Sequence, residues 1–324
     1  MKQITAIGMY NAVWRYCDST GLVRVLKNSF KSSESSRFAK LRISRDGLHL
    51  VDAVHCVYDK RRTLYFLNEL DRVVTRKSVV LEAGIGTGIL TFFAATRAKH
   101  VYGYEINKSI LRFAQEVGSY LTHRMIMNNK PTLTLRDATR GTVPEKVDVI
   151  LSENIYSGMF FEKQVQIMNR LRKYLKRGGV MIPQGLFSYV ALAETQLPVR
   201  SKHLDLFVPS PERHVNFKRC ELSRPQLYSR INFSRRIDRG VDVDLRVPVS
   251  RGGLFNSVVI YSEVHMPSGK IIKRDDTTFL NSDIILAFQP AVRVSKGETV
   301  CLRLKYQYGA KPGAALLKAA IIPK

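Results

Sequence analysis

The chain has 324 residues, 45% of them hydrophobic, and a formal net charge of +25 at pH 7. This length is enough for two domains, each with its own core. No apolar run approaches the roughly 18 residues that a membrane-spanning helix needs, and the N-terminus lacks the apolar centre and cleavage site of a signal peptide. We therefore expect a cytoplasmic protein without a membrane segment.

The positive charge is spread almost evenly along the chain. Its net value is +7 in residues 1–76, +8 in residues 77–183 and +10 in residues 184–324. A large positive charge suggests an acidic partner, whereas a nucleic-acid-binding surface more often shows as a stripe of basic residues. A generally basic surface and a nucleic-acid partner both remain open.

The cysteines indicate a reducing compartment. Cys17, Cys56, Cys220 and Cys301 lie far apart and lack the spacing of metal ligands. We interpret them as reduced and buried, and we expect no metal site.

Residues 1–76 show helical periodicity on both sides of a polar segment. Residues 31–47 are rich in serine and charged residues, so we expect a loop there. The helical pattern returns from Leu48 to Leu70, with Asp59 and Arg62 inside it.

Residues 77–183 alternate between strand and helix patterns, which is typical of a doubly wound α/β domain. The predicted strands are Val79–Glu82, Val101–Glu105, Thr132–Arg136, Val147–Ser152 and Val180–Pro183. The predicted helices are Ile89–Arg97, Lys108–Tyr120 and Glu162–Lys176. We expect Gly178 and Gly179 to cap the last helix, with Lys176 at the negative end of its dipole.

Beyond Pro183 the pattern changes to short strands separated by turn signals, without a long helix. The predicted strands are Phe187–Leu192, Val241–Val247, Asn256–His265, Asp283–Phe288 and Val300–Gln307. This pattern predicts an antiparallel β domain, either a barrel or a sandwich.

A glycine-rich turn follows the first predicted parallel strand and opens a helix. It begins at Glu82 and contains Gly84, Gly86 and Gly88. Glycines let the backbone approach a ligand, and the N–H groups at a helix N-terminus favour a polar one. A dinucleotide fingerprint is G-x-G-x-x-G, but here the third glycine comes one residue early and an acid precedes the first.

A second acid, Glu105, ends the next predicted strand, where a carboxylate can accept hydrogen bonds from a ribose diol. Glu82 is placed to hold a cationic amine, and Asp137 and Ala138 follow the third strand, near an adenine edge. A ligand with an ammonium group, a ribose and no phosphates fits both acids. The pattern therefore predicts an S-adenosylmethionine site, with a nucleotide cofactor as the alternative.

Two further acids, Glu153 and Glu162, flank the loop after the fourth predicted strand. Paired carboxylates can hold a guanidinium group by bidentate hydrogen bonds, because its fork geometry meets them in two places. The other interpretation makes Glu162 an acid at a helix N-terminus, paired with the dipole. The residues alone leave both interpretations open.

The chain resembles the protein arginine methyltransferases. The resemblance rests on VLEAGIGTGIL, on Glu105 and above all on SENIYSGMFFE, which matches the family's double-glutamate loop, including the spacing of its acids. YLKRGGVMIPQGLFSYVALAE resembles the family's passage into its barrel. The segment from Asp59 to Thr63 resembles the family's D-x-x-R-T segment, and the similarity extends from about residue 50 to the C-terminus.

The resemblance implies a Rossmann-like class I methyltransferase domain followed by an antiparallel β-barrel domain. An N-terminal helical segment at 1–76, a cofactor-binding domain at 77–183 and a substrate and oligomerisation domain at 184–324 would follow. It also implies a homodimer. Arg62 would pair with the cofactor carboxylate, and Glu153 and Glu162 would be the catalytic residues that orient the substrate guanidinium.

The chain departs from the family's pattern at several places. A Tyr-Phe pair is missing near residues 41–46, and residues 280–283 read Leu-Asn-Ser-Asp instead of a Thr-His-Trp loop. Cys56 replaces a methionine, and Asn154-Ile155 replaces a Trp-Met pair. The family's dimerisation arm, expected within residues 195–220, is not clearly recognisable.

We therefore expect an S-adenosylmethionine-dependent methyltransferase that transfers methyl to the guanidino nitrogen of arginine in a protein substrate. Two alternatives remain. The net charge favours a methyltransferase acting on RNA or another non-protein substrate, although the Asn/Asp-Pro-Pro-aromatic motif of many such enzymes is absent after the fourth strand. The departures from the family pattern favour a cofactor-binding scaffold with impaired catalysis.

Overall fold

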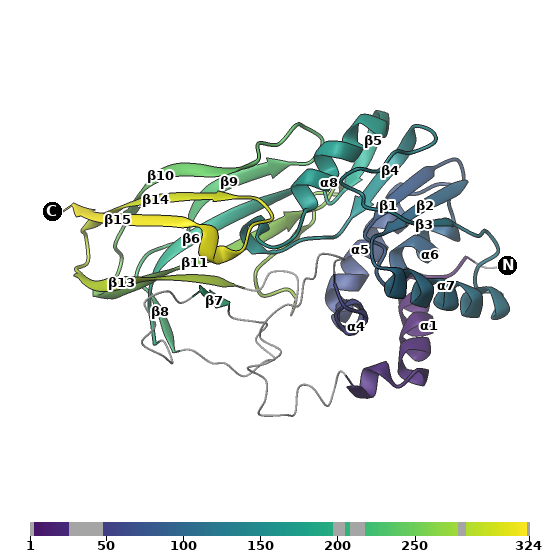
Figure 1. Ribbon diagram of the computed structural model, residues 1–324, viewed down its shortest axis with the longest axis horizontal. Helices are drawn as coiled ribbons and strands as arrows, with labels where there is room; N and C mark the ends of the chain where they lie inside the picture. Colours follow the sequence, from purple (N-terminus) through teal and green to yellow (C-terminus); the bar gives the residue numbers. More distant parts are fainter. Residues whose placement is uncertain (1–2, 26–47, 197–204, 208–217, 278–282, 323–324) are drawn as a thin grey trace.

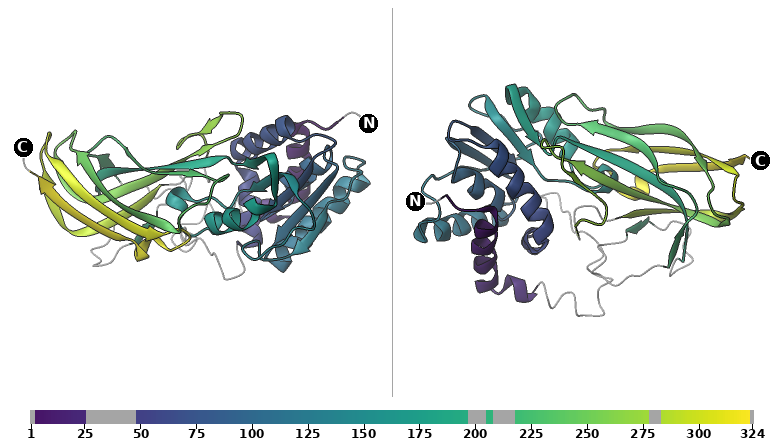
Figure 2. Two further views of the ribbon diagram at one scale, coloured as in Figure 1. Left: turned by 90° about the horizontal axis from the view of Figure 1, so that it is seen from above. Right: turned by 180° about the vertical axis from the view of Figure 1, so that it is seen from behind.

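The computed structural model describes residues 3–25, 48–196, 205–207, 218–277 and 283–322. Helices and parallel strands occupy the first part of the chain, and antiparallel strands the second (Figure 1). The two parts lie end to end and give the molecule an elongated shape, which the views in Figure 2 also show.

In the part of the chain that the structure describes, the helices α1 (Ala6–Ser19), α4 (Leu50–Tyr58) and α5 (Lys60–Val73) precede the first strand. The predicted helical stretch from Leu48 to Leu70 is therefore two helices. The break lies at Asp59, whose side chain accepts a hydrogen bond from the backbone N–H of Arg62 at 3.1 Å and so caps α5. The predicted loop at 31–47 lies outside the described residues.

The first sheet is parallel and has five strands. They are β1 (Val79–Ala83), β2 (His100–Glu105), β3 (Thr132–Leu135), β4 (Val147–Ser152) and β5 (Leu175–Ile182), in the order β3-β2-β1-β4-β5. The connecting helices are α6 (Ile89–Ala95), α7 (Lys108–His123) and α8 (Gln164–Leu171). The direction of winding reverses between β1 and β4, and ligands of such sheets bind beyond the carboxyl ends of the strands at that point. The predicted doubly wound architecture is confirmed.

The last helix of this part is shorter than predicted. A 3-10 turn at Arg172–Tyr174 separates α8 from β5, and Lys176 lies within β5. The Lys176 Nζ lies 3.0 and 2.9 Å from the two carboxylate oxygens of Asp148 on β4. The predicted helix cap at Gly178–Gly179 is therefore wrong, because Lys176 pairs with the neighbouring strand and not with a helix dipole.

The second part consists of two antiparallel sheets. The seven-stranded sheet contains β6 (Gly185–Thr195), β7 (Asp205–Phe207), β8 (Arg219–Glu221), β9 (Gln226–Asn232), β11 (Gly253–His265), β12 (Ile271–Ile272) and β13 (Ile284–Val294). The three-stranded sheet contains β10 (Gly240–Pro248), β14 (Thr299–Gln307) and β15 (Leu316–Ile322). Both sheets contain predicted strands, whereas β7, β8, β9, β12 and β15 were not predicted. The barrel, like the domain boundaries at 76 and 183, stays a prediction.

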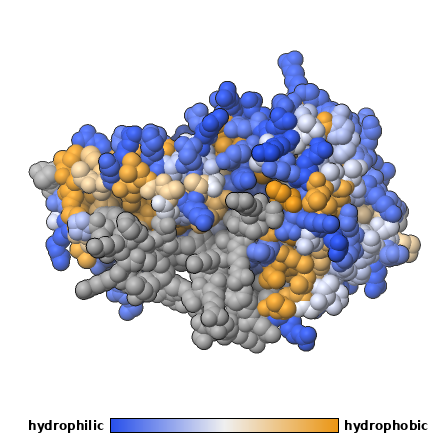
Figure 3. Space-filling model, viewed as in Figure 1, coloured by the Kyte–Doolittle hydropathy of each residue, from blue (hydrophilic) through white to orange (hydrophobic). Residues whose placement is uncertain are grey.

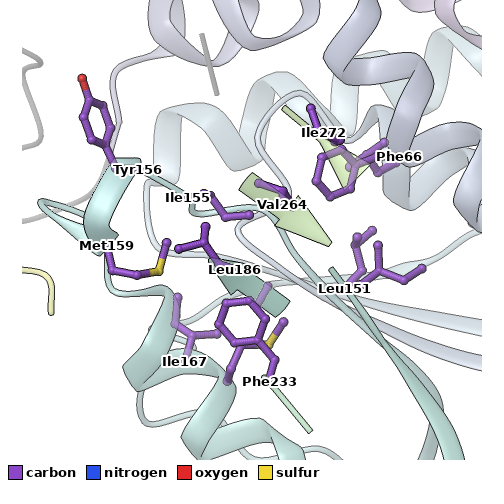
Figure 4. Close-up of a cluster of buried hydrophobic side chains, with 14 of the residues drawn as sticks. Phe66, Leu151, Ile155, Tyr156, Met159, Ile167, Leu186, Phe233, Val264 and Ile272 are labelled. Atoms are coloured by element: carbon purple, nitrogen blue, oxygen red, sulfur yellow. The ribbon is translucent and has the colours of Figure 1, made fainter. Parts of the chain in front are cut away.

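One hydrophobic core runs through both parts of the molecule. At the junction, the first part contributes Phe66 of α5 and Leu151 of β4. The second part contributes Leu186 of β6, Val264 of β11 and Phe233, which follows β9 (Figure 4). All five are at most 1% exposed. The double-glutamate loop therefore lies over a core to which both parts contribute.

The surface is mostly hydrophilic on the face seen in Figure 3, while apolar side chains gather toward the end that carries β14 and β15. None of the described helices is long and apolar enough to cross a membrane. The four cysteines are unpaired, but only Cys17 is buried; the other three are half-buried, so the predicted burial is wrong for them. Cys56 lies in α4, Cys220 in β8 and Cys301 in β14, and each keeps part of its surface exposed.

Candidate active site

A cavity of about 400 Å³ lies beyond the carboxyl ends of the parallel strands. Nine of the predicted site residues line it: Arg62, Glu82, Gly84, Gly86, Glu105, Asp137, Ala138, Glu153 and Glu162. Gly88, also predicted, is the N-cap of α6 and is not among the lining residues. The topology thus gathers into one cavity residues that lie as much as 100 positions apart in sequence.

The glycine turn forms one wall of the cavity. Gly84 and Gly86 have φ values of +79° and +55°, in the left-handed region that favours glycine. A Cβ at Gly84 would meet the Asn154 side chain at 2.5 Å, whereas a Cβ at Gly86 would meet only the Ala53 Cβ, at 4.0 Å. Gly84 therefore allows close packing of the loop after β4, and the backbone at Gly86 is open toward the cavity.

Glu105 ends β2 and its carboxylate is organised by backbone groups. It accepts hydrogen bonds from the N–H groups of Gly86 at 3.1 Å, Ile106 at 2.9 Å and Asn107 at 3.0 Å. Burial raises the pKa of Glu105, and these three bonds oppose the rise. The carboxylate is thus fixed against the glycine turn, where an acceptor for ribose hydroxyls was expected.

Glu82 lies at the end of β1, 2% exposed, and accepts a hydrogen bond from the Thr91 hydroxyl of α6. Burial raises the pKa of Glu82 to about 8, and the charge of Glu105 adds to the rise, while the Thr91 bond opposes it. An opposite charge nearby favours the ionised form of a carboxyl group. A cationic ligand in the cavity would therefore be favoured by Glu82.

Asp137 lies after β3, with Ala138 beside it. Its carboxylate accepts hydrogen bonds from the backbone N–H of Thr139 at 2.9 Å and from its hydroxyl at 2.7 Å. Burial works to raise the pKa of Asp137, but these bonds prevail and lower it. This end of the cavity thus holds an ionised carboxylate fixed by its own turn.

Arg62 forms an ion pair with Glu153 in this structure. Its side chain, 9% exposed, lies in the first turn of α5, and its Nη1 donates to the Cys56 carbonyl at 3.0 Å. Among the described residues, nothing accepts a hydrogen bond from its buried Nε. One donor of the guanidinium is therefore left without a partner among them, in a residue that lines the cavity.

The base of the double-glutamate loop is held by an amide network that sequence analysis missed. Gln164 accepts hydrogen bonds from the Ser152 hydroxyl at 2.9 Å and from the Asn154 N–H at 3.1 Å. The Asn154 side chain donates to the carbonyl of Ala83 on β1 at 2.9 Å. Asn154 was read only as a departure from the family pattern. The signal that could have identified it is Gly84, which makes room for its amide.

Glu162 ends the loop and is half-buried at the cavity wall. Burial and the charge of Glu105 raise the pKa of Glu162 to about 7. Sequence analysis left open whether Glu162 belongs to a helix N-terminus, and the structure starts α8 only at Gln164. Several carboxyl groups thus share one cavity, an arrangement that favours positively charged ligands.

Two residues of the loop between the glutamates lie away from the cavity. Tyr156 and Met159 are buried but are not among the lining residues, and Figure 4 shows Met159 within the junction core. The Phe161 ring lines the cavity instead and meets the Tyr156 ring edge-on, with centroids 5.3 Å apart. Residues 41–46, 280–282 and most of the expected arm lie outside the described residues.

The comparisons with known proteins support a methyltransferase domain. Residues 75–204 match the family model of a methyltransferase domain. The chain carries a class I methyltransferase domain. Its cofactor is S-adenosylmethionine, the methyl donor of this class. The residues fit this cofactor: the Gly86 backbone is open to the cavity, and the Arg62 guanidinium, a cation at the cavity wall, suits its carboxylate.

The domain is similar in sequence to protein arginine methyltransferases. The chain is 32% identical to protein arginine N-methyltransferase 8-B of Danio rerio over 42% of its length. It is 34% identical to protein arginine N-methyltransferase 1 of Dictyostelium discoideum over 43%. It spans 32% and 40% of those two proteins.

Two similarities extend over most of the chain. An uncharacterized Methanocaldococcus jannaschii protein, MJ1452, is 25% identical over 78% of this chain and 90% of its own length. In structure, the chain is similar to a Trypanosoma brucei PRMT1 enzyme–prozyme heterotetrameric complex with AdoHcy. The TM-score is 0.65 at 14% identity, covering 85% of this chain and 99% of that one. The structural similarity thus covers both parts of this chain, the class I methyltransferase fold and the antiparallel β part.

Proposed function

We propose that the protein transfers a methyl group from S-adenosylmethionine to a guanidino nitrogen of arginine in a protein substrate. The observation that carries this proposal is the meeting of Glu153 and Glu162, from the two ends of one loop, in the cofactor cavity. Two carboxylates suit a guanidinium, whose planar donors form paired hydrogen bonds. The similarity to arginine methyltransferases supports the same substrate class.

The cofactor supplies an electrophilic methyl group on a sulfonium. The cavity residues hold it: Glu105 would bind the ribose hydroxyls, Glu82 the ammonium and Arg62 the carboxylate. Asp137 and Ala138 would border the adenine. Arg62 would then share its donors between the cofactor carboxylate and Glu153.

Glu153 and Glu162 would orient the guanidinium and draw its positive charge away from the attacking nitrogen. Alignment supplies much of the rate, since reacting atoms held about 3–3.5 Å apart react as if intramolecular. The new N–C bond forms as the S–C bond breaks, and the nitrogen must lose one proton. Glu162, with its pKa raised to about 7, is suited to accept that proton.

The test is transfer of radiolabelled methyl from S-adenosylmethionine into a cell lysate, half treated with protease and half with nuclease. We expect label that protease removes and nuclease does not. Label removed only by nuclease would favour the RNA methyltransferase that the net charge of +25 suggests. Intact cofactor binding with no label would favour a scaffold without catalysis.

The proposal includes a homodimer and a cytoplasmic location. Enzymes with a similar β part assemble: the Trypanosoma brucei protein is described as a heterotetrameric complex. The four unpaired cysteines are compatible with a reducing compartment. Light scattering of the purified protein should give twice the monomer mass of 36.9 kDa. A mass equal to that of one chain would contradict the proposed homodimer.

A further inference from the structure

The loop between Glu153 and Glu162 has an unusual backbone. Gly158, Met159 and Phe161 have φ values of +64°, +59° and +60°. Side chains other than glycine rarely adopt this left-handed region, and such conformations persist only where the surroundings impose them. The loop that carries both proposed catalytic residues therefore needs to be held from outside.

The β part of the molecule holds it at one residue, Gly158. The N–H of Gly158 donates to the Ser262 hydroxyl on β11 at 2.9 Å. The Gly158 carbonyl accepts a hydrogen bond from the Tyr306 hydroxyl on β14 at 2.8 Å. Ser262 is fully buried and Tyr306 is 3% exposed, so water cannot replace either hydroxyl.

Further contacts fix the same segment. The Phe160 ring stacks on the Tyr306 ring, with centroids 4.2 Å apart and planes at 19°. The N–H of Gly309 donates to the Met159 carbonyl at 2.7 Å, and the N–H of Phe161 donates to the Ala310 carbonyl at 2.9 Å. The strained residues are thus attached to the segment that follows β14.

Each holding hydroxyl is itself oriented by another. The Tyr306 hydroxyl lies 2.7 Å from that of Tyr228 on β9, and the Ser262 hydroxyl lies 2.8 Å from that of Ser188 on β6. All four side chains are buried. The network runs from three strands of the seven-stranded sheet and one strand of the three-stranded sheet to the backbone of a single loop residue, Gly158.

We propose that Tyr306 and Ser262 are positioning residues, which set the distance and orientation of Glu153 and Glu162 by fixing the backbone N–H and carbonyl of Gly158. This inference rests on the proposed function. It makes the β part a structural component of the active site, in addition to any substrate surface it offers. A shift of about 1 Å in catalytic groups can reduce a rate about 100-fold.

The test compares Tyr306→Phe with Tyr308→Phe. Both remove one buried tyrosine hydroxyl, but that of Tyr308 bonds Ser229, at 2.9 Å, and not the loop. We expect faster amide hydrogen exchange in residues 157–161 for Tyr306→Phe alone. With the protein fraction of a lysate as acceptor, the rate at saturating S-adenosylmethionine should fall about tenfold or more, with an unchanged KM for the cofactor. Tyr308→Phe should leave the amide exchange of residues 157–161 and the methyl-transfer rate at their wild-type values.

A second pair guards against a folding defect in the first. Ser262→Ala removes the second hydroxyl that bonds Gly158. Ser257→Ala removes a hydroxyl on the same strand, but this one bonds the Thr195 hydroxyl, at 2.7 Å. Faster exchange of the loop only in Ser262→Ala supports the inference. Equal loop exchange within both pairs would overturn it. Because exchange is read without methyl transfer, an inactive wild-type protein would contradict the proposed function and leave this inference testable.

Discussion

At the scale of single residues, the cavity concentrates carboxyl groups that are reluctant to ionise. Burial raises the pKa values of Glu82, Glu105 and Glu162, and their mutual repulsion contributes for Glu82 and Glu162. A cofactor with an ammonium and a sulfonium, and a substrate with a guanidinium, would each relieve that penalty. The acids therefore make the cavity favour cationic ligands, in addition to serving as hydrogen-bond acceptors.

The first prediction concerns the two loop acids. Glu153→Gln and Glu162→Gln should each reduce methyl transfer by about 10²–10³-fold or more, because a neutral amide stabilises developing charge poorly. Cofactor binding, measured by calorimetry, should survive in both variants. Unchanged turnover in either one would remove the arginine interpretation. The matched variant Glu116→Gln, on the exposed side of α7, should keep full activity.

The second prediction is a pH dependence. The pKa of Glu162 is raised to about 7, so its carboxyl group is protonated below that pH and ionised above it. If the ionised form holds the guanidinium and takes its proton, the rate should rise with pH, with a midpoint at or below about 7 because bound cations favour the ionised form. Initial rates at saturating S-adenosylmethionine test this, since they do not depend on cofactor affinity. A rate that falls over this range would contradict the assignment.

At the scale of elements, the sequence predicted the cofactor side better than the acceptor side. The strand, turn and helix around Gly84 and Gly86 have a local pattern, and strand ends meet at one edge of a parallel sheet. The Arg62–Glu153 pair could not be predicted, because it joins α5 to the loop after β4. Nor could the contact of Asn154 with Ala83, which depends on packing between separate strands.

The third prediction tests the glycine turn. Gly86→Val should abolish cofactor binding in calorimetry, since its side chain would project into the cavity from a backbone with φ of +55°. Gly178→Val is the matched control: φ there is +76°, and nothing lies within 4 Å of the added Cβ. Both variants carry the strain of a left-handed residue, about 1–2 kcal/mol. Binding retained by Gly86→Val would contradict the turn assignment.

At the scale of the whole molecule, the two parts share one core and one active-site loop. The sequence predicted both parts and their order from the change of pattern at Pro183. It did not predict β15, because Leu316–Ile322 is a largely apolar segment without strict alternation. The β5 strand was partly missed because Lys176 was assigned to a helix end, while its partner, Asp148, lies on a neighbouring strand.

The fourth prediction follows from the shared core. Phe233 is fully buried at the junction, so Phe233→Ala should lower the free energy of unfolding by about 3–5 kcal/mol. Denaturant unfolding, followed by fluorescence and circular dichroism, should show the whole transition shifted. Met125→Ala, at a residue 72% exposed, should change it by less than about 0.5 kcal/mol. Two separate transitions, with only one shifted, would contradict a common core.

The most direct measurement of the central claim is amino-acid analysis of the labelled protein fraction. Protein from a lysate is methylated with labelled S-adenosylmethionine, hydrolysed and separated against methylated standards. The proposed geometry of Glu153 and Glu162 predicts that the label elutes with Nω-methylated arginine and is absent with Glu162→Gln. Label that elutes with methylated lysine or histidine, or that is recovered only from nucleosides, would contradict it.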